Sequence, residues 1–104
     1  MHARTSIVRF QAGAADEATH IFRDIMLPSA SSQKGFQGAL MLRSDTDLEK
    51  HIIISIWETE ADMLASSPPE EIVPLLEPLD DMIAEISQDS YQVLLQMGGP
   101  ARRE

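Results

Sequence analysis

The sequence contains no cysteine and no asparagine, and its aromatic residues are few: one tryptophan, one tyrosine and three phenylalanines. Without cysteine the chain can form no disulfide, has no thiolate nucleophile and offers no thiolate ligand to a metal. Its apolar runs are short, and residues 1–6 lack the apolar core of a signal peptide. We therefore expect a cytoplasmic protein with no membrane partner.

Basic residues are also scarce. The chain has 8 Lys and Arg against 17 Asp and Glu, a formal net charge of −9. No Lys or Arg occurs between Lys50 and Arg102, whereas the stretch from Glu58 to Asp89 supplies ten carboxylates. Nucleic-acid binding needs clustered Lys and Arg, so we expect no nucleic-acid partner. We interpret the acidic stretch as a solvated helix surface, with a protein-binding face as the alternative.

The residues that usually hold metals or phosphates are not grouped. The three histidines stand apart at positions 2, 20 and 51, and the acidic pairs at 70–71 and 80–81 are adjacent residues that do not share a helix face. His20 falls opposite the apolar stripe of its predicted helix, which indicates a surface residue. There is no glycine-rich phosphate loop. We expect no metal site and no cofactor.

Hydrophobic periodicity predicts the order β-α-β-β-α-β, with a short extra helix after the third strand. Four segments have the composition of strands: residues 5–11, 36–43, 51–57 and 91–96. The first helix is predicted over residues 14–27, and Pro28 is expected to end or kink it. Thr59 is expected to cap a short helix reaching Ala65. The capping-box pattern from Ser67 to Glu70 predicts a last helix that continues to Ile86.

This order is the ferredoxin-like α+β plan, an antiparallel sheet with helices on one face. We expect one domain over residues 1–96 and a flexible C-terminal tail over 97–104. The third strand is apolar on both faces, and Ile52, Ile54 and Ile56 point to the side that the helices leave uncovered. An exposed row of isoleucines favours burial against the same face of a second copy. The pattern thus predicts a homodimer.

Two motifs lead to a known family. Gly35-Phe36-Gln37-Gly38 opens the second strand, and Ile54-Ser55-Ile56-Trp57-Glu58-Thr59-Glu60-Ala61 leads from the third strand into the short helix. Together, over about residues 4–96, the chain resembles the antibiotic biosynthesis monooxygenases, a family of dimeric α+β barrels. The resemblance implies a cofactor-independent monooxygenase acting on a small aromatic substrate, either a quinol or a polyketide-type phenol. The family also includes haem-degrading enzymes and proteins of no known reaction.

By the resemblance, a cavity between sheet and helices is faced by Ile53, Ser55 and Trp57, with Trp57 stacking on the substrate. Ser55 and Tyr91 are the polar residues expected to orient a substrate oxygen. Three further candidates for the lining are apolar: Phe22, Ile25 and Met63. For each candidate the alternative is an ordinary core or surface role.

The functional residues of the family are incompletely matched. Haem-degrading relatives use an asparagine on the first strand and a histidine about ten residues after the tryptophan; here that second position falls near Ser67, and no histidine follows His51. We therefore do not expect haem degradation. Phenol oxygenases of the family place an asparagine where this chain has Ile53. No catalytic acid or base stands out, so a non-catalytic dimeric ligand-binding or accessory protein is the alternative function.

Two arginines lie in predicted strands and have two open interpretations. Arg9 and Arg43 either hold an anionic substrate or reach solvent at an edge.

Overall fold

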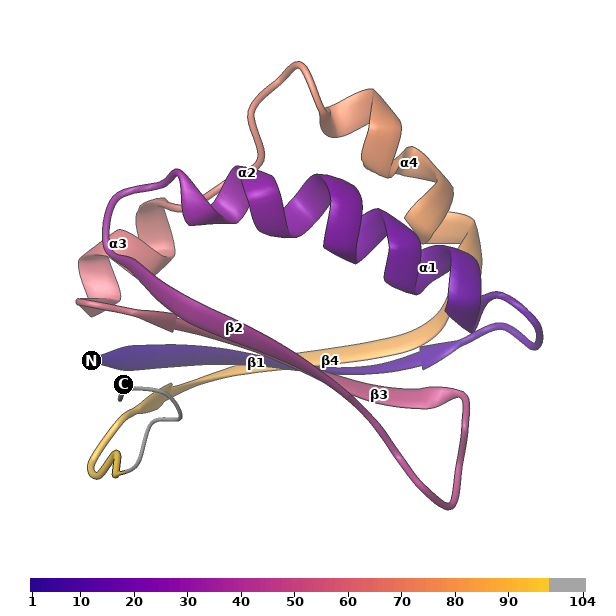
Figure 1. Ribbon diagram of the computed structural model, residues 1–104, viewed down its shortest axis with the longest axis horizontal. Coiled ribbons are helices and arrows are strands. Elements are labelled where there is room, and N and C mark those ends of the chain that lie inside the picture. Colours follow the sequence, from indigo (N-terminus) through magenta and orange to yellow (C-terminus); the bar gives the residue numbers. More distant parts are fainter. Residues whose placement is uncertain (98–104) are drawn as a thin grey trace, which may run out of the picture.

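A computed structural model describes residues 1–97 of the chain. Four antiparallel strands form one sheet in the order β2-β3-β1-β4, and the helices pack on one of its faces (Figure 1). The strands are β1 (His2–Phe10), β2 (Phe36–Arg43), β3 (Lys50–Trp57) and β4 (Ile83–Gln92). The helices are α1 (Ala15–Ile21), the π-helical segment η1 (Phe22–Met26), α2 (Leu27–Ser31), α3 (Glu60–Ala65) and α4 (Val73–Met82). The ferredoxin-like α+β prediction is confirmed, and β3 is central as expected. Apart from Met97, the predicted tail lies outside the described residues.

Strand register decides which side chains face the helices, because successive residues of a strand point to opposite faces. β1 pairs with β3 so that Arg4 lies opposite Ser55 and Ser6 opposite Ile53. On its other side β1 pairs with β4, which places Ser6 opposite Gln88. These five residues share the helix-covered face and approach one another across three strands.

The core lies between this face and the helices. Its buried centre consists of Val8 and Phe10 of β1, Ala18 of α1 and Leu79 of α4. His51 is also buried and meets Phe10 edge to face, with ring centroids 4.9 Å apart. The small alanine lets α1 approach the sheet closely, and the larger apolar side chains fill the remaining space.

Helical structure does not end at Pro28, so of the two alternatives expected there the helix end is wrong. Helical structure continues through α2 to Ser31. Just before the proline, the N–H of Leu27 bonds to the carbonyl of Phe22, five residues back, which is a π-helical turn. Pro28 then lies in the first turn of α2, where a missing N–H costs little. The π turn therefore absorbs the proline without ending the helix.

The capping box at Ser67 does not start a helix, which is a second correction. Residues 66–69 are irregular, and α4 begins only at Val73. Consecutive prolines favour extended backbone in the residues before them. In addition, Gln33 binds both backbone groups of Ser67: its Nε2 donates to the Ser67 carbonyl at 2.8 Å and its Oε1 accepts from the Ser67 N–H at 3.2 Å. A long-range contact thus holds this segment open.

The last strand also starts earlier than predicted. α4 ends at Met82, and β4 runs over Ile83–Gln92, not over 91–96. Ile86 follows earlier apolar residues at helical spacing. This spacing wrongly predicted that the last helix continues to Ile86. In the structure β4 pairs with β1 along its whole length, from Phe10 opposite Ile83 to His2 opposite Gln92. Non-local hydrogen bonding therefore overrides the local pattern.

The short helix α3 begins as predicted. The side chain of its N-cap, Thr59, accepts a hydrogen bond from the N–H of Asp62 at 3.0 Å, and the helix ends at Ala65. Within residues 1–97, none of the helices has the length and apolar composition needed to cross a bilayer.

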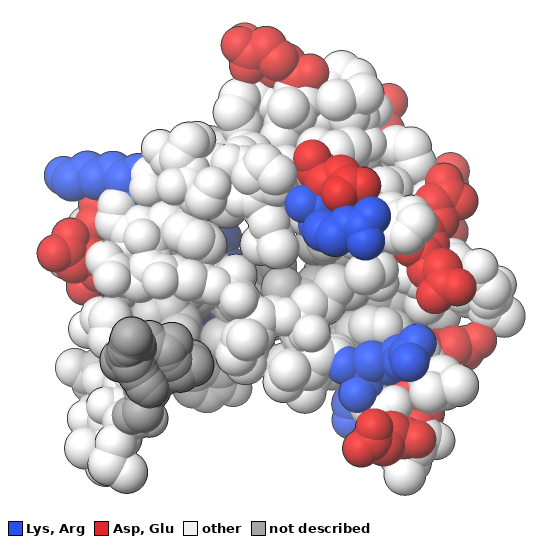
Figure 2. Space-filling model, viewed as in Figure 1, with Lys and Arg blue, Asp and Glu red and all other residues white. Residues whose placement is uncertain are grey.

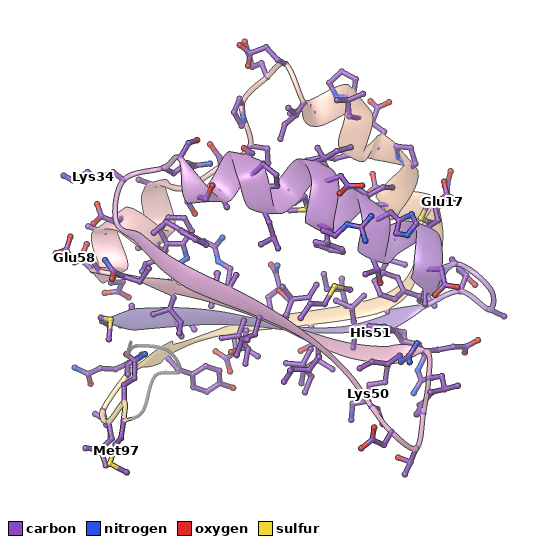
Figure 3. The ribbon with its side chains drawn as sticks, in the orientation of Figure 1. Glu17, Lys34, Lys50, His51, Glu58 and Met97 are labelled. Carbon is purple, nitrogen blue, oxygen red and sulfur yellow. The ribbon has the colours of Figure 1, made fainter. Side chains whose placement is uncertain are left out.

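Among residues 1–97, no helix covers the face of the sheet turned away from the helices (Figure 1), and exposed apolar side chains lie on this face. Leu40 and Leu42 of β2 are 56% and 45% exposed, and Ile7 of β1 is 44% exposed. The register places further residues on the same face: Ile52, Ile54, Ile56 and Tyr91. We call these seven residues the open apolar face. Figure 3 shows Lys50 pointing away from the helices at one end of the sheet.

Candidate functional site

A cavity of about 370 Å³ lies between the sheet and the helices. Figure 2 shows the surface hollowed at this place. Pockets that hold small organic ligands have volumes of about 300–1,000 Å³, so the cavity fits one small molecule. The helices contribute mostly apolar side chains, among them Phe22, Met26, Leu76 and Leu79. Part of this wall is the π-helical segment η1, so the proline-induced turn also shapes the cavity.

Four of the predicted site residues line the cavity: Phe22, Ile53, Ser55 and Trp57. Trp57 is only 3% exposed. Its ring meets Phe36 edge to face, with centroids 5.4 Å apart and an interplanar angle of 82°. Both rings belong to the lining, so the cavity has an aromatic end held in a fixed orientation.

Three predicted residues lie elsewhere. Tyr91 is 52% exposed on the open apolar face, and its hydroxyl donates to Asp89 at 3.4 Å. The early start of β4 fixes the register that turns it away from the cavity. Met63 is buried in α3 without lining the cavity, and Ile25 is half-buried in η1 outside the lining.

Two serines on the sheet side of the cavity are fixed by neighbouring side chains. The indole Nε1–H of Trp57 donates to Ser55 Oγ at 3.0 Å, and Gln88 Nε2 donates to Ser6 Oγ at 3.1 Å. Each serine oxygen thus accepts a hydrogen bond from the protein. A hydroxyl still has its own hydrogen, so both serines are able to donate to a ligand in the cavity.

Arg4 also lines the cavity, and the sequence analysis did not identify it. Its Nη2 donates to the carbonyl of Met63 at 3.0 Å, which fixes the guanidinium beside α3. The available signal was the alternation of β1, because Arg4 and Ser6 share a face with the core residue Val8. It was missed because residues 2–4 were not recognised as part of the strand.

The two arginines left open by the sequence lie outside the cavity lining. Arg9 pairs with Asp47, with one hydrogen bond from Nη1 at 3.2 Å, and approaches Glu85 at 3.9 Å. The hydrogen bond from Arg9 and its charge hold the pKa of Asp47 below its ordinary value. Arg43 is exposed. Among residues 1–97, then, Arg9 joins a surface ion cluster and Arg43 reaches solvent.

Few titratable groups border the cavity. Among the described residues that line the cavity, Asp80 of α4 is the one with a carboxylate, and none is a histidine. Ser67, near the position at which haem-degrading relatives have a histidine, lies at the cavity. No cluster of three His, Asp or Glu in residues 1–97 is arranged to hold a metal ion. The hydroxyl of Ser29, which also lines the cavity, is buried with no hydrogen-bond partner in the described part of the chain.

Solved structures show the same fold. A candidate antibiotic biosynthesis monooxygenase from Nitrosomonas europaea is 16% identical, with 91% of this chain and 100% of that chain covered and a TM-score of 0.78. SnoaB, a cofactor-independent oxygenase from Streptomyces nogalater, is 15% identical, with 94% and 97% covered and a TM-score of 0.75. A variant of MhuD, solved with two manganese protoporphyrin IX molecules bound per active site, is 19% identical, with 95% and 100% covered and a TM-score of 0.71.

No curated protein matches the chain. A family model does match, over residues 1–68, and it describes antibiotic biosynthesis monooxygenases. The match includes β1, β2, β3 and α3, and therefore Arg4, Ser6, Ser55 and Trp57. The chain belongs to the antibiotic biosynthesis monooxygenase family.

Proposed function

We propose that the protein is a cofactor-independent monooxygenase that acts on a small aromatic substrate, a quinol or a polyketide-type phenol. The observation that carries this proposal is the cavity, whose aromatic end, Trp57 and Phe36, suits a flat ring. Family membership and the fold shared with SnoaB support oxygenase chemistry. The lining offers no histidine to ligate haem iron, so we do not propose haem degradation.

The proposed reaction needs only the substrate and O₂. The phenol loses its O–H proton, and the phenolate gives one electron to O₂. The resulting radical and superoxide join at a ring carbon to form a C–O bond. The peroxide takes up the proton that the phenol released, and loss of water then breaks the O–O bond and removes the hydrogen of that carbon, leaving a second carbonyl. One oxygen atom enters the quinone product and the other leaves as water, so the substrate supplies all the electrons.

The side chains of the cavity would contribute orientation and exclusion of water. Trp57 would support one face of the ring, and Ser55, held by the Trp57 indole, would donate to a substrate oxygen. Apolar side chains from η1 and α4 would cover the other side. No catalytic acid or base is assigned.

Oxygen consumption tests the proposal. Metal-stripped protein is mixed with a panel of quinols and polycyclic phenols, and O₂ uptake is followed beside that of Trp57→Ala. We expect multiple turnovers by the wild type and at least about a tenfold loss in the variant, because the ring loses its support. Arg43→Gln, changed at an exposed position, is the control and should keep full activity. Absence of uptake across the panel would contradict the proposal.

The second candidate function is non-catalytic ligand binding by the same cavity. The lining favours it because few of its residues could act as an acid or base: Asp80 supplies a carboxylate, and the described lining contains no histidine. A ligand that binds with a defined stoichiometry and is recovered unchanged would support it. Multiple turnover of any phenol would exclude it.

We further propose that two copies associate through the open apolar face. Seven apolar or aromatic side chains there would otherwise remain in water, which is unusual for a monomer. A two-fold arrangement buries the same row on both copies. Sedimentation velocity tests this, and the decisive variants are described below.

A further inference from the structure

The sheet side of the cavity carries hydrogen-bond donors and a positive charge. Arg4 lines the cavity, and Ser55 lies opposite it in the register of β1 and β3. Ser6 follows two residues along β1 on the same face. We call Arg4, Ser6 and Ser55 the donor cluster.

The protein leaves this cluster without an acceptor of matching charge. Arg9 and Arg23 each pair with a carboxylate, whereas no salt bridge to Arg4 is formed within residues 1–97. The guanidinium of Arg4 has five N–H donors, and its hydrogen bond to the Met63 carbonyl uses one of them. Asp80 lines the cavity from α4 without pairing with it. In a chain of net charge −9, a half-buried arginine without a carboxylate partner is unusual.

The two serines reinforce the same preference. Trp57 and Gln88 each occupy one acceptor site on these oxygens, and each serine keeps its hydroxyl hydrogen to donate to a ligand. Several donors lining one cavity favour an oxygen that bears negative charge, since charge-assisted hydrogen bonds are about twice as strong as neutral ones. The rest of the lining is apolar and aromatic.

We propose that the cavity selects a ligand with an aromatic body and one oxyanion, a carboxylate or a phenolate, and that the donor cluster binds this oxyanion. The inference deepens the proposed function, on which it rests for the cavity being the ligand site. Arg4 supplies the charge and its fork of donors, while Ser6 and Ser55 fix the position of the oxygen. The aromatic body would lie against Trp57 and Phe36.

Isothermal titration calorimetry with three matched probes tests the proposal: naphthalene-2-carboxylate, naphthalene-2-carboxamide and 2-naphthol. We expect the wild type to bind the carboxylate at least about tenfold more tightly than the neutral carboxamide. Arg4→Gln should abolish this preference and leave the carboxamide affinity within about twofold. Arg43→Gln should behave as the wild type.

The naphthol distinguishes the two oxyanions. A phenolate site is assigned if the wild type, but not Arg4→Gln, binds the naphthol more tightly as it ionises. A carboxylate site is assigned if the preference is confined to the carboxylate. Should Arg4→Gln fail to fold by circular dichroism, Arg4→Lys keeps the charge and is expected to show a reduced preference for the anion.

Three results would overturn the proposal: equal wild-type affinity for carboxylate and carboxamide, an equal loss of both in Arg4→Gln, or no binding of any probe. The proposed function fails separately. Absence of oxygen uptake with the anion preference intact would remove the oxygenase chemistry alone, and loss of the preference with uptake intact would remove this inference alone.

Discussion

The two faces of the sheet are built from alternate residues of the same four strands, but they differ in chemistry. The face under the helices carries Arg4, Ser6 and Ser55 beside apolar residues, and it borders a cavity. The face open to solvent carries seven Ile, Leu and Tyr side chains beside polar residues such as Thr5, Ser87 and Asp89. An antiparallel sheet with one solvated face usually carries polar residues on that face. The polar groups at the cavity and the apolar row on the outer face are what the two proposed binding surfaces require, one for a small ligand and one for a second chain.

Ile53 and Ile54 provide the strongest test of this comparison, because they are neighbours of identical type on opposite faces. Ile54→Asp should convert the dimer to a folded monomer, since burial of an unpaired carboxylate in the interface costs several kcal/mol. Ile53→Asp places the same charge against the core and should prevent stable folding. Sedimentation velocity and circular dichroism distinguish the two outcomes. An intact Ile54→Asp dimer would contradict the proposed interface.

A smaller effect is expected inside the cavity when Ser55 is changed to alanine. The indole N–H of the buried Trp57 then loses its acceptor, which should lower the free energy of unfolding by about 1–3 kcal/mol. Urea denaturation followed by circular dichroism measures this. The matched control is the same substitution in a Trp57→Phe background, where no N–H remains and the loss should be smaller. Equal losses in both backgrounds would show that the hydrogen bond is not the cause.

The smallest effect concerns the ion cluster beyond the cavity. Because the hydrogen bond from Arg9 lowers the pKa of Asp47 below its ordinary 3.8, this carboxylate stabilises the fold above that pH. The contribution is lost as the pH falls through the lowered pKa. We therefore compare the urea midpoint at pH 7 with that at a pH below 3.8. The midpoint of the wild type should fall slightly more than that of Asp47→Asn. Asp45→Asn, in the same loop, should follow the wild type; identical pH dependence in all three proteins would refute the assignment.

The local signals in the sequence were sufficient where structure is short-range. β2 has the predicted bounds, α3 begins at its Thr59 cap, and the row of isoleucines on β3 identified the central strand and its two faces. Alternation in β3 also placed Ile53, Ser55 and Trp57 on the cavity side. Capping and strand alternation depend on neighbouring residues only, and a single sequence contains that information.

Other features depended on partners distant in the chain. Pairing with β1 extends β4 back to Ile83 and turns Tyr91 out of the cavity, and the contact of Gln33 with Ser67 keeps a capping-box sequence irregular. A π turn carries the first helix past Pro28. The position of Arg4 opposite Ser55, on which the proposed oxyanion site depends, likewise follows from strand pairing. The sequence by itself determined the order of the elements and the two faces of β3, because these follow from local periodicity. Only the tertiary structure decided which polar groups meet in the cavity, because hydrogen bonds between distant strands set the register.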